Sequence, residues 1–106
     1  MTIFDKSNSV QQMTFGETIR KQREEKKLLL RQVAAYLEVD TAFVSKLERG
    51  ERNASRGQVI KLADFLQTPQ EPLLTIWLAD RITNMINNDK LGEDALKLTL
   101  KNFRIK

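Results

Sequence analysis

The fold of this chain is decided by residues 31–50, which read RQVAAYLEVDTAFVSKLERG. Apolar residues recur three and four positions apart in both halves of the stretch, which predicts two short amphipathic helices joined by a tight turn. Asp40 is placed to be the N-cap of the second helix, because its carboxylate can accept from the free amides of the first turn. Gly50 is placed to end that helix, because glycine adopts the left-handed conformation at little cost. The stretch therefore predicts a helix–turn–helix.

The outer face of the second helix is small, polar and basic. Its members are Thr41, Ala42, Ser45, Lys46 and Arg49. A short helix with such a face suits insertion into the major groove of DNA. Basic residues are also concentrated within and beside the stretch, where they would attract a polyanion. They are Arg20, Lys21, Arg23, Lys26, Lys27, Arg31, Lys46, Arg49, Arg52 and Arg56.

The same residues carry a resemblance to a known family. The run QVA at residues 32–34, then Val39, then VSKLERGERN at residues 44–53 resemble the Cro/C1-type (XRE family) helix-turn-helix of bacterial and phage regulators. The resemblance extends from about Phe15 to Leu66, half of the chain. It implies an all-α, lambda repressor-like helix-turn-helix domain that binds double-stranded DNA. Within the family, the short chain is similar to restriction–modification controller proteins and to phage-type repressors.

The resemblance implies roles for residues on and around the second helix. Contacts to base edges are expected from Thr41, Ala42 and Lys46, because lysine can donate to guanine while the two methyl groups can meet a thymine methyl. For Phe43 two alternatives are open, contact with sugars or thymine methyls and packing within the protein. Contacts to phosphates or flanking groups, which set orientation and most of the affinity, are expected from a larger set. It comprises Arg31, Gln32, Phe43, Ser45, Arg49, Arg52, Asn53 and Arg56.

Arg23 and Glu48 correspond to an arginine and a glutamate that often pair across the fold in this family. The resemblance therefore implies that these two residues form a structural ion pair and do not contact DNA.

Two positions depart from the family pattern. Family members usually have a serine or threonine near Leu29, which caps the next helix and touches a phosphate. The expected substitutes here are Arg31 and Gln32, and the helix amides can still receive a phosphate. Glu38 stands where many relatives have glycine in the turn. A positive φ at this residue would cost roughly 1 kcal/mol, and a different turn would avoid that cost.

Apolar spacing and capping residues predict helices on both sides of the central stretch. Thr14 and Glu17 form a capping box for the first helix, and Ser55 caps the fourth. Residues 1–13 show no helical stripe and are expected to be a flexible arm. The predicted helices span residues 15–27, 31–38, 41–48, 56–66, 72–87 and 93–103.

The fifth predicted helix carries more apolar surface than its own small domain would cover. Its stripe is formed by Leu74, Trp77, Leu78, Ile82 and Met85. Such a helix can pack on its own domain and on a partner. We therefore expect a homodimer interface at Leu74, Trp77, Leu78 and Ile82; purely intramolecular packing is the alternative. The last helix has three open roles, which are completing the dimer, covering the core and binding a second protein.

These patterns divide the chain into three parts. Residues 1–13 form the arm, residues 14–67 the helix-turn-helix DNA-binding domain, and residues 68–106 a C-terminal helical extension for dimerisation.

Composition argues against catalysis and metal binding. The chain has no cysteine and no histidine, so it lacks thiolate metal ligands and also the residue that is both the commonest acid–base catalyst and the commonest metal ligand. It also lacks a glycine-rich phosphate loop, and we expect neither enzyme activity, a cofactor nor a metal. No apolar run approaches the roughly 20 residues that span a bilayer. The start of the chain lacks a secretory pattern, and the absence of cysteine fits a reducing cytoplasm.

The sequence thus predicts a transcriptional regulator that binds a palindromic operator as a homodimer, with its recognition helix in the major groove. The alternative of another class is an antitoxin-like or scaffold protein whose C-terminal helices bind another protein. Co-purification with a stoichiometric partner would favour this alternative, whereas a bare dimer that shifts a palindromic duplex would favour the regulator.

Overall fold

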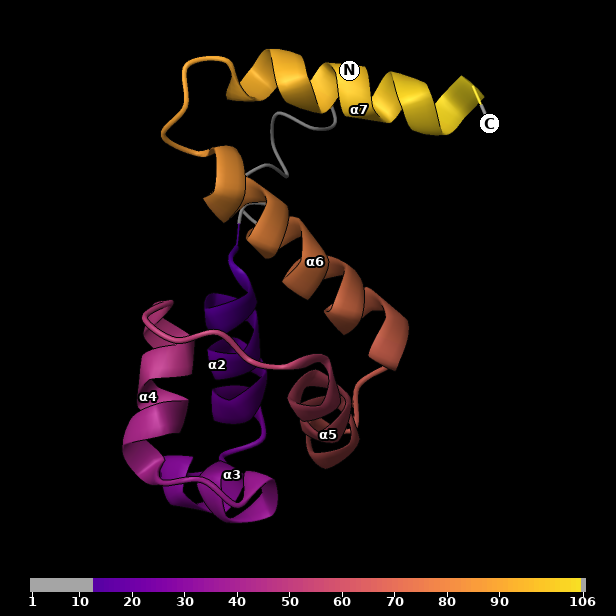
Figure 1. Ribbon diagram of the computed structural model, residues 1–106. Helices are drawn as coiled ribbons and strands as arrows, with labels where there is room; N and C mark the ends of the chain where they lie inside the picture. The colour runs from indigo at the N-terminus through magenta and orange to yellow at the C-terminus, as the bar shows by residue number, and fades with distance from the viewer. Residues whose placement is uncertain (1–12, 106) are drawn as a thin grey trace.

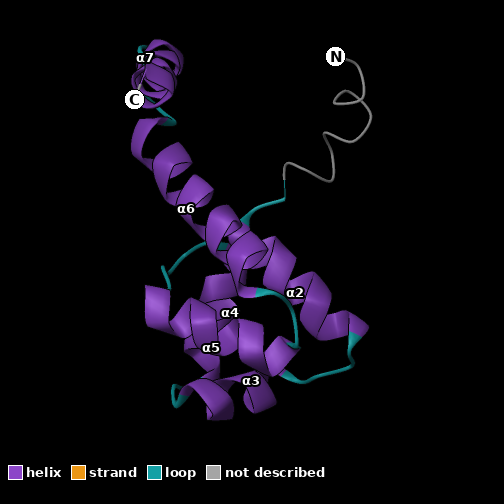
Figure 2. Ribbon diagram, turned by 90° about the vertical axis from the view of Figure 1, so that its right-hand side faces the viewer, coloured by secondary structure: helices purple, strands orange, loops and turns teal. Residues whose placement is uncertain are grey.

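The computed structural model describes residues 13–105, which fold into helices and connecting loops without a strand (Figures 1 and 2). The prediction of an all-α fold is confirmed, and each predicted helix is present with ends that differ by at most two residues. Apart from Met13, the predicted arm lies outside the described residues. The helices are α2 (Phe15–Glu25), α3 (Leu30–Leu37), α4 (Thr41–Arg49), α5 (Arg56–Leu66), α6 (Gln70–Ile86) and α7 (Gly92–Ile105).

Side-chain caps begin three of these helices as predicted. The hydroxyl of Thr14 accepts a hydrogen bond from the amide of Glu17 at 3.1 Å, and the Glu17 carboxylate accepts from the Thr14 amide at 3.0 Å. Asp40 accepts from the amide of Phe43 at 2.8 Å and so begins α4. Ser55 forms a second capping box, with Gln58, at the start of α5. Each cap satisfies a backbone donor that the helix itself leaves free.

The turn into α3 and the turn out of it both show how the chain departs from the family pattern. Leu29 is the N-cap of α3 and its side chain has no acceptor, but its own amide donates to Gln32 Oε1 at 2.7 Å. Glu38 ends α3 with φ of 61°, so of the two alternatives left open by the sequence the chain adopts the positive φ and not a different turn. Gly50 ends α4 with φ of 79°, where glycine is free of the strain that Glu38 carries.

The hydrophobic core lies among α2, α3, α4, α5 and the first half of α6. Figures 1 and 2 show α2–α5 clustered around it, while α6 runs from this cluster to α7 at the far end of the molecule. None of the helices in residues 13–105 is long and apolar enough to cross a membrane. The core residues are Phe15, Ile19, Val33, Ala34, Leu37, Val44, Leu47, Ala54, Val59, Leu62, Ala63, Leu66, Leu73 and Trp77.

Helix α6 begins two residues earlier than predicted. Pro72 is the third residue of the helix, not the first. Proline fits there because the amides of the first helical turn have no intrahelical acceptor, so none is lost.

Trp77 belongs to the chain's own core. Its side chain is 5% exposed, its indole donates to the carbonyl oxygen of Ala54 at 2.9 Å, and the guanidinium groups of Arg56 and Arg81 lie over its ring. Of the four residues expected at a dimer interface, Trp77 therefore has little surface to offer a partner. Leu74 is half-buried on the same core, whereas Leu78 and Ile82 are exposed.

Candidate nucleic-acid interface

Helix α4 has a buried face and an exposed face, as its sequence pattern predicts. Val44 and Leu47 are buried in the core, while the three residues expected to contact bases, Thr41, Ala42 and Lys46, are exposed on the other side. The structure therefore brings the three together on one outward surface. The hydroxyl and methyl groups of Thr41, the methyl group of Ala42 and the ammonium group of Lys46 are therefore all accessible on the intact helix, and each is of a type that can contact a base edge.

A shallow hollow lies beside this surface, between the start of α4 and the loop that follows the helix. It is lined by Asp40, Ala42, Phe43, Lys46 and Arg52, together with Val39. Phe43 packs partly against the core, and the guanidinium of Arg52 lies 4.9 Å from its ring centre. Packing within the protein, one of the two alternatives for Phe43, thus accounts for part of its surface. This packing also holds Arg52 at the edge of α4.

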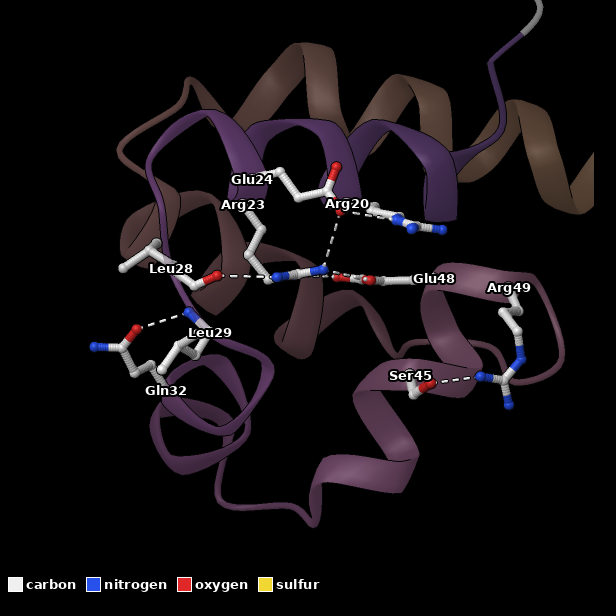
Figure 3. A network of polar contacts seen from close by, with 9 residues as sticks. All are labelled: Arg20, Arg23, Glu24, Leu28, Leu29, Gln32, Ser45, Glu48 and Arg49. Carbon is white, nitrogen blue, oxygen red and sulfur yellow. Dashed lines mark hydrogen bonds and ion pairs between the residues drawn. The ribbon is translucent and has the colours of Figure 1, made fainter.

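The structure pairs Arg23 with Glu48 beneath this surface (Figure 3). Arg23 Nε donates to one Glu48 oxygen at 2.7 Å, Nη2 donates to the other at 3.1 Å, and Nη1 donates to the carbonyl oxygen of Leu28 at 2.9 Å. The two side chains are 12% and 7% exposed. The hydrogen bond to Glu48 raises the pKa of the Arg23 guanidinium above its ordinary value, against the lowering effect of burial. The pair ties α4 to α2 and to the loop that leads into α3.

Arg49 contacts Ser45 and an acidic neighbour. Arg49 donates to both Glu51 oxygens, at 3.0 and 3.2 Å, and also to the Ser45 hydroxyl (Figure 3 shows the serine contact). The hydrogen bond raises the pKa of Arg49 and lowers that of Glu51. All these groups are at the surface, so a phosphate could replace the Glu51 carboxylate as the partner of Arg49.

The remaining residues expected at the DNA backbone lie on the elements before and after α4. Arg31 and Gln32 are exposed in the first turn of α3, where Gln32 also caps its helix. Arg52, Asn53 and Arg56 are exposed along the loop after α4 and at the start of α5. Arg52 lies beside Ala42 and Lys46 at the hollow, and Arg31 and Arg56 are exposed on the helices α3 and α5, so cationic groups are available for phosphate contacts.

Two residues that position α2 and α4 were not identified from the sequence. Gly16 lies where α2 meets the end of α4, and a Cβ there would be 2.4 Å from the carbonyl oxygen of Leu47. Asp80 on α6 accepts from the amide of Phe15 at 3.0 Å and so holds the start of α2. A lone glycine inside an amphipathic helix pattern is a usable signal for close helix packing, but the sequence gives no comparable signal for Asp80.

A helix-turn-helix family model matches residues 19–71, half of the chain. The protein therefore belongs to the helix-turn-helix family of the Cro/C1 (XRE) type, which confirms the resemblance seen in the sequence. Two proteins of Bacillus subtilis (strain 168) are similar to it. The HTH-type transcriptional repressor RghR is 42% identical over 62 residues, which are 58% of this chain and 46% of RghR. The uncharacterized HTH-type transcriptional regulator RghRB is 38% identical over 61 residues, which are 57% of this chain and 44% of RghRB.

The match thus spans less than half the length of either relative. Among solved structures, the restriction-modification controller protein C.AhdI from Aeromonas hydrophila is similar, with a TM-score of 0.53 and 33% sequence identity. That match covers 57% of this chain and 92% of C.AhdI. It supports the Cro/C1-like fold of the helical domain.

Proposed function

We propose that this protein is a sequence-specific DNA-binding transcriptional regulator that acts in the cytoplasm as a homodimer on a palindromic operator. The exposed face of α4 carries this proposal, because Thr41, Ala42 and Lys46 lie together on it and the cationic side chain of Arg52 lies beside it. RghR, which is named a transcriptional repressor, supports the same function. The protein acts by binding and not as an enzyme.

In this proposal the two sets of residues do different work. Lys46 donates to guanine O6 and N7, while Thr41 and Ala42 meet thymine methyl groups. Phosphates are held by the residues expected at the DNA backbone. The buried Arg23–Glu48 pair contacts no DNA but keeps α4 at a fixed angle to α2.

A homodimer follows from the small footprint of one recognition helix. A single α4 reads only a few base pairs, and two-fold symmetry doubles this number with half-sites roughly 34 Å apart. Residues 14–67 would bind DNA and residues 68–106 would join the two copies. The exposed Leu78 and Ile82 on α6 support this division.

Comparing two alanine variants tests the assignment of specificity and affinity. The best site is first selected from random duplexes, and binding is then measured on this site and on random DNA over a range of salt. For Lys46→Ala, we expect a loss of roughly 1–3 kcal/mol, about 5- to 160-fold, on the selected site and a smaller loss on random DNA. For Arg31→Ala, we expect similar losses on both and a salt slope lower by about 1.

Arg31 is a suitable match because its exposed side chain makes no hydrogen bond or ion pair to any residue that the structure describes. Equal losses on the two DNAs for the Lys46 variant would show that this lysine contacts only phosphate. A parent protein that shifts no selected duplex would contradict the proposed function itself.

A second candidate function is favoured by the apolar residues that α7 leaves exposed, including Leu96, Leu98 and Leu100. In this case the protein is antitoxin-like or a scaffold, and its C-terminal helices bind another protein. Recovery of a stoichiometric protein partner with the untagged chain would support it.

A further inference from the structure

Helix α7 and the last turns of α6 enclose an apolar groove. It is lined by Ile82 and Met85 on α6 and by Leu96, Leu100 and Phe103 on α7, among others. Figures 1 and 2 both show α7 crossing the far end of α6, away from the cluster of α2–α5. The groove is therefore separate from the surface that α4 presents.

The corner between α6 and α7 is built by specific contacts. A Cβ on Gly92 would lie 2.5 Å from the carbonyl oxygen of Ile86, so only glycine permits the two helices to meet this closely. The Asp89 side chain accepts from the amide of Leu91 at 2.9 Å, and its carbonyl oxygen accepts from the amide of Gly92 at 2.9 Å. These contacts fix the direction of α7 and hold the groove open.

Charges along α7 are separated by sign. Glu93 and Asp94 lie in its first turn, whereas Lys101 and Arg104 lie near its end. Between them, Lys97 forms an exposed ion pair with Glu93 at 3.4 Å, which a contact from a second copy would share or replace. With about 100° of rotation per residue, Glu93 and Arg104 fall on the same edge of the stripe formed by Leu96 and Leu100. When two identical helices pack antiparallel through one stripe, each edge of the stripe faces the same edge of the other helix. The start of one helix then lies beside the end of the other. Glu93 of each copy then meets Arg104 of the other.

We propose that the groove is occupied by the α7 helix of a second copy of this chain, packed antiparallel to the first. The helices α6 and α7 of both copies then form one four-helix core. This interface presupposes the homodimer proposed above and names the helix that closes it. A parallel arrangement would not bring Glu93 and Arg104 together, because unlike edges face each other there.

The exposed area agrees with an interface between two copies. The exposed fractions of residues that line the groove are 47% for Ile82, 81% for Met85, 45% for Leu96 and 47% for Leu100. With roughly 200 Å² for a side chain of this size, these residues offer on the order of 500 Å² of apolar area per copy. This area is comparable with the apolar part, roughly 60%, of the about 800 Å² per partner that a standard stable interface buries.

The first test uses a matched pair of variants on α7, each studied as the full chain by sedimentation velocity at micromolar concentration. Leu100 lines the groove, whereas Leu98 is 60% exposed and lies roughly 200° around the helix from it. We expect Leu100→Glu to raise the dimer dissociation constant more than tenfold and Leu98→Glu to leave it nearly unchanged. Circular dichroism should show the same helix content for both.

The second test determines the direction of the pairing. Glu93→Lys alone places like charges at both contacts of its homodimer, and so does Arg104→Glu. Mixing the two variants makes both contacts attractive in the heterodimer. The ratio of heterodimer to total homodimer should therefore exceed its statistical value, about one, severalfold. Native mass spectrometry can measure this share when one variant carries an affinity tag.

The outcomes separate this interface from the proposed function. A monomeric parent protein contradicts both the proposed homodimer and its α7 interface. DNA binding by the parent is measured separately, so the proposed DNA-binding function can still succeed or fail. A dimeric parent whose Leu100→Glu variant remains a dimer overturns the α7 interface but leaves the homodimer in place. A heterodimer share at the statistical value overturns the antiparallel order. A parent that is monomeric alone but binds a different protein through the groove also overturns this interface.

Discussion

Replacing Gly16 with alanine should destabilise the fold and move the recognition helix. Gly16 is buried in the first turn of α2, and a Cβ there would lie 2.4 Å from the carbonyl oxygen of Leu47 and 2.5 Å from that of Glu48. Ordinary contacts of a Cβ begin at 3.4 Å, so α2 and α4 must separate by about 1 Å. Both obstructing atoms are backbone, which a rotamer change cannot move.

The size of the effect can be estimated from these contacts. Overpacking of this kind costs about 1–3 kcal/mol, and two backbone obstacles place Gly16→Ala at the upper end. The better helix propensity of alanine returns at most about 1 kcal/mol. A net loss of roughly 2 kcal/mol would lower the Tm by about 8–16 °C in a domain of this size. Shifting the end of α4 should also weaken DNA binding at temperatures where the variant remains folded.

Gly57 provides the matched control for the same substitution. It is exposed in the first turn of α5, and the nearest atom to a Cβ there is Ser55 Oγ at 4.0 Å. Gly57→Ala should therefore stabilise the fold, by roughly 0.5–1 kcal/mol. Thermal and urea unfolding followed by circular dichroism measure both variants. If Gly16→Ala melts at or above the parent temperature, α2 and α4 do not approach as closely as the reasoning requires.

Three further predictions concern polar groups. Arg23→Met leaves a buried carboxylate unpaired and should cost about 3–5 kcal/mol in urea unfolding, whereas Arg20→Met removes only an exposed pair and should cost less than about 1 kcal/mol. Glu51→Gln frees a surface arginine for phosphate and should tighten binding to specific and random DNA alike, which a fluorescence titration can measure. The hydrogen bond to Asp64 raises the pKa of Tyr36, so ultraviolet titration should show that Asp64→Asn lowers it. Because the folded-state pKa is raised, the stability from this bond is present below the ordinary tyrosine pKa and is lost as the pH rises through the raised value.

The parts of the fold that could be predicted from the sequence are those that depend on interactions between residues only a few positions apart. The caps at Asp40 and Ser55 and the left-handed residue Gly50 were each identified from their immediate neighbours. Capping hydrogen bonds close over three or four residues, so the residue types that make them stand together in the sequence. The boundaries of α4 and α5 followed from these signals. The outward face of α4 followed as well, because burying Val44 and Leu47 leaves the remaining positions exposed.

Contacts between distant parts of the chain could not be predicted in the same way. The Phe15 amide and the Asp80 carboxylate are 65 positions apart, and no local pattern links them. Trp77 was expected at a dimer interface because it lies in the apolar stripe of α6. A stripe does not show which of its residues face the chain's own domain. In the structure Trp77 faces it, buried in the core with its indole donating to the carbonyl oxygen of Ala54.

Helix α6 changes its role along its length, and this change connects the two proposed interfaces. Its first half is fixed to the core by the buried Trp77 and by Asp80, which holds the start of α2. Its second half turns Ile82 and Met85 toward the groove that α7 completes. Because one continuous helix carries both halves, the groove holds a fixed position relative to α4. In the proposed homodimer, the distance between the two recognition helices is therefore set by α6 and by the Gly92 corner. The spacing of operator half-sites would then be determined by packing far from the bases that α4 reads.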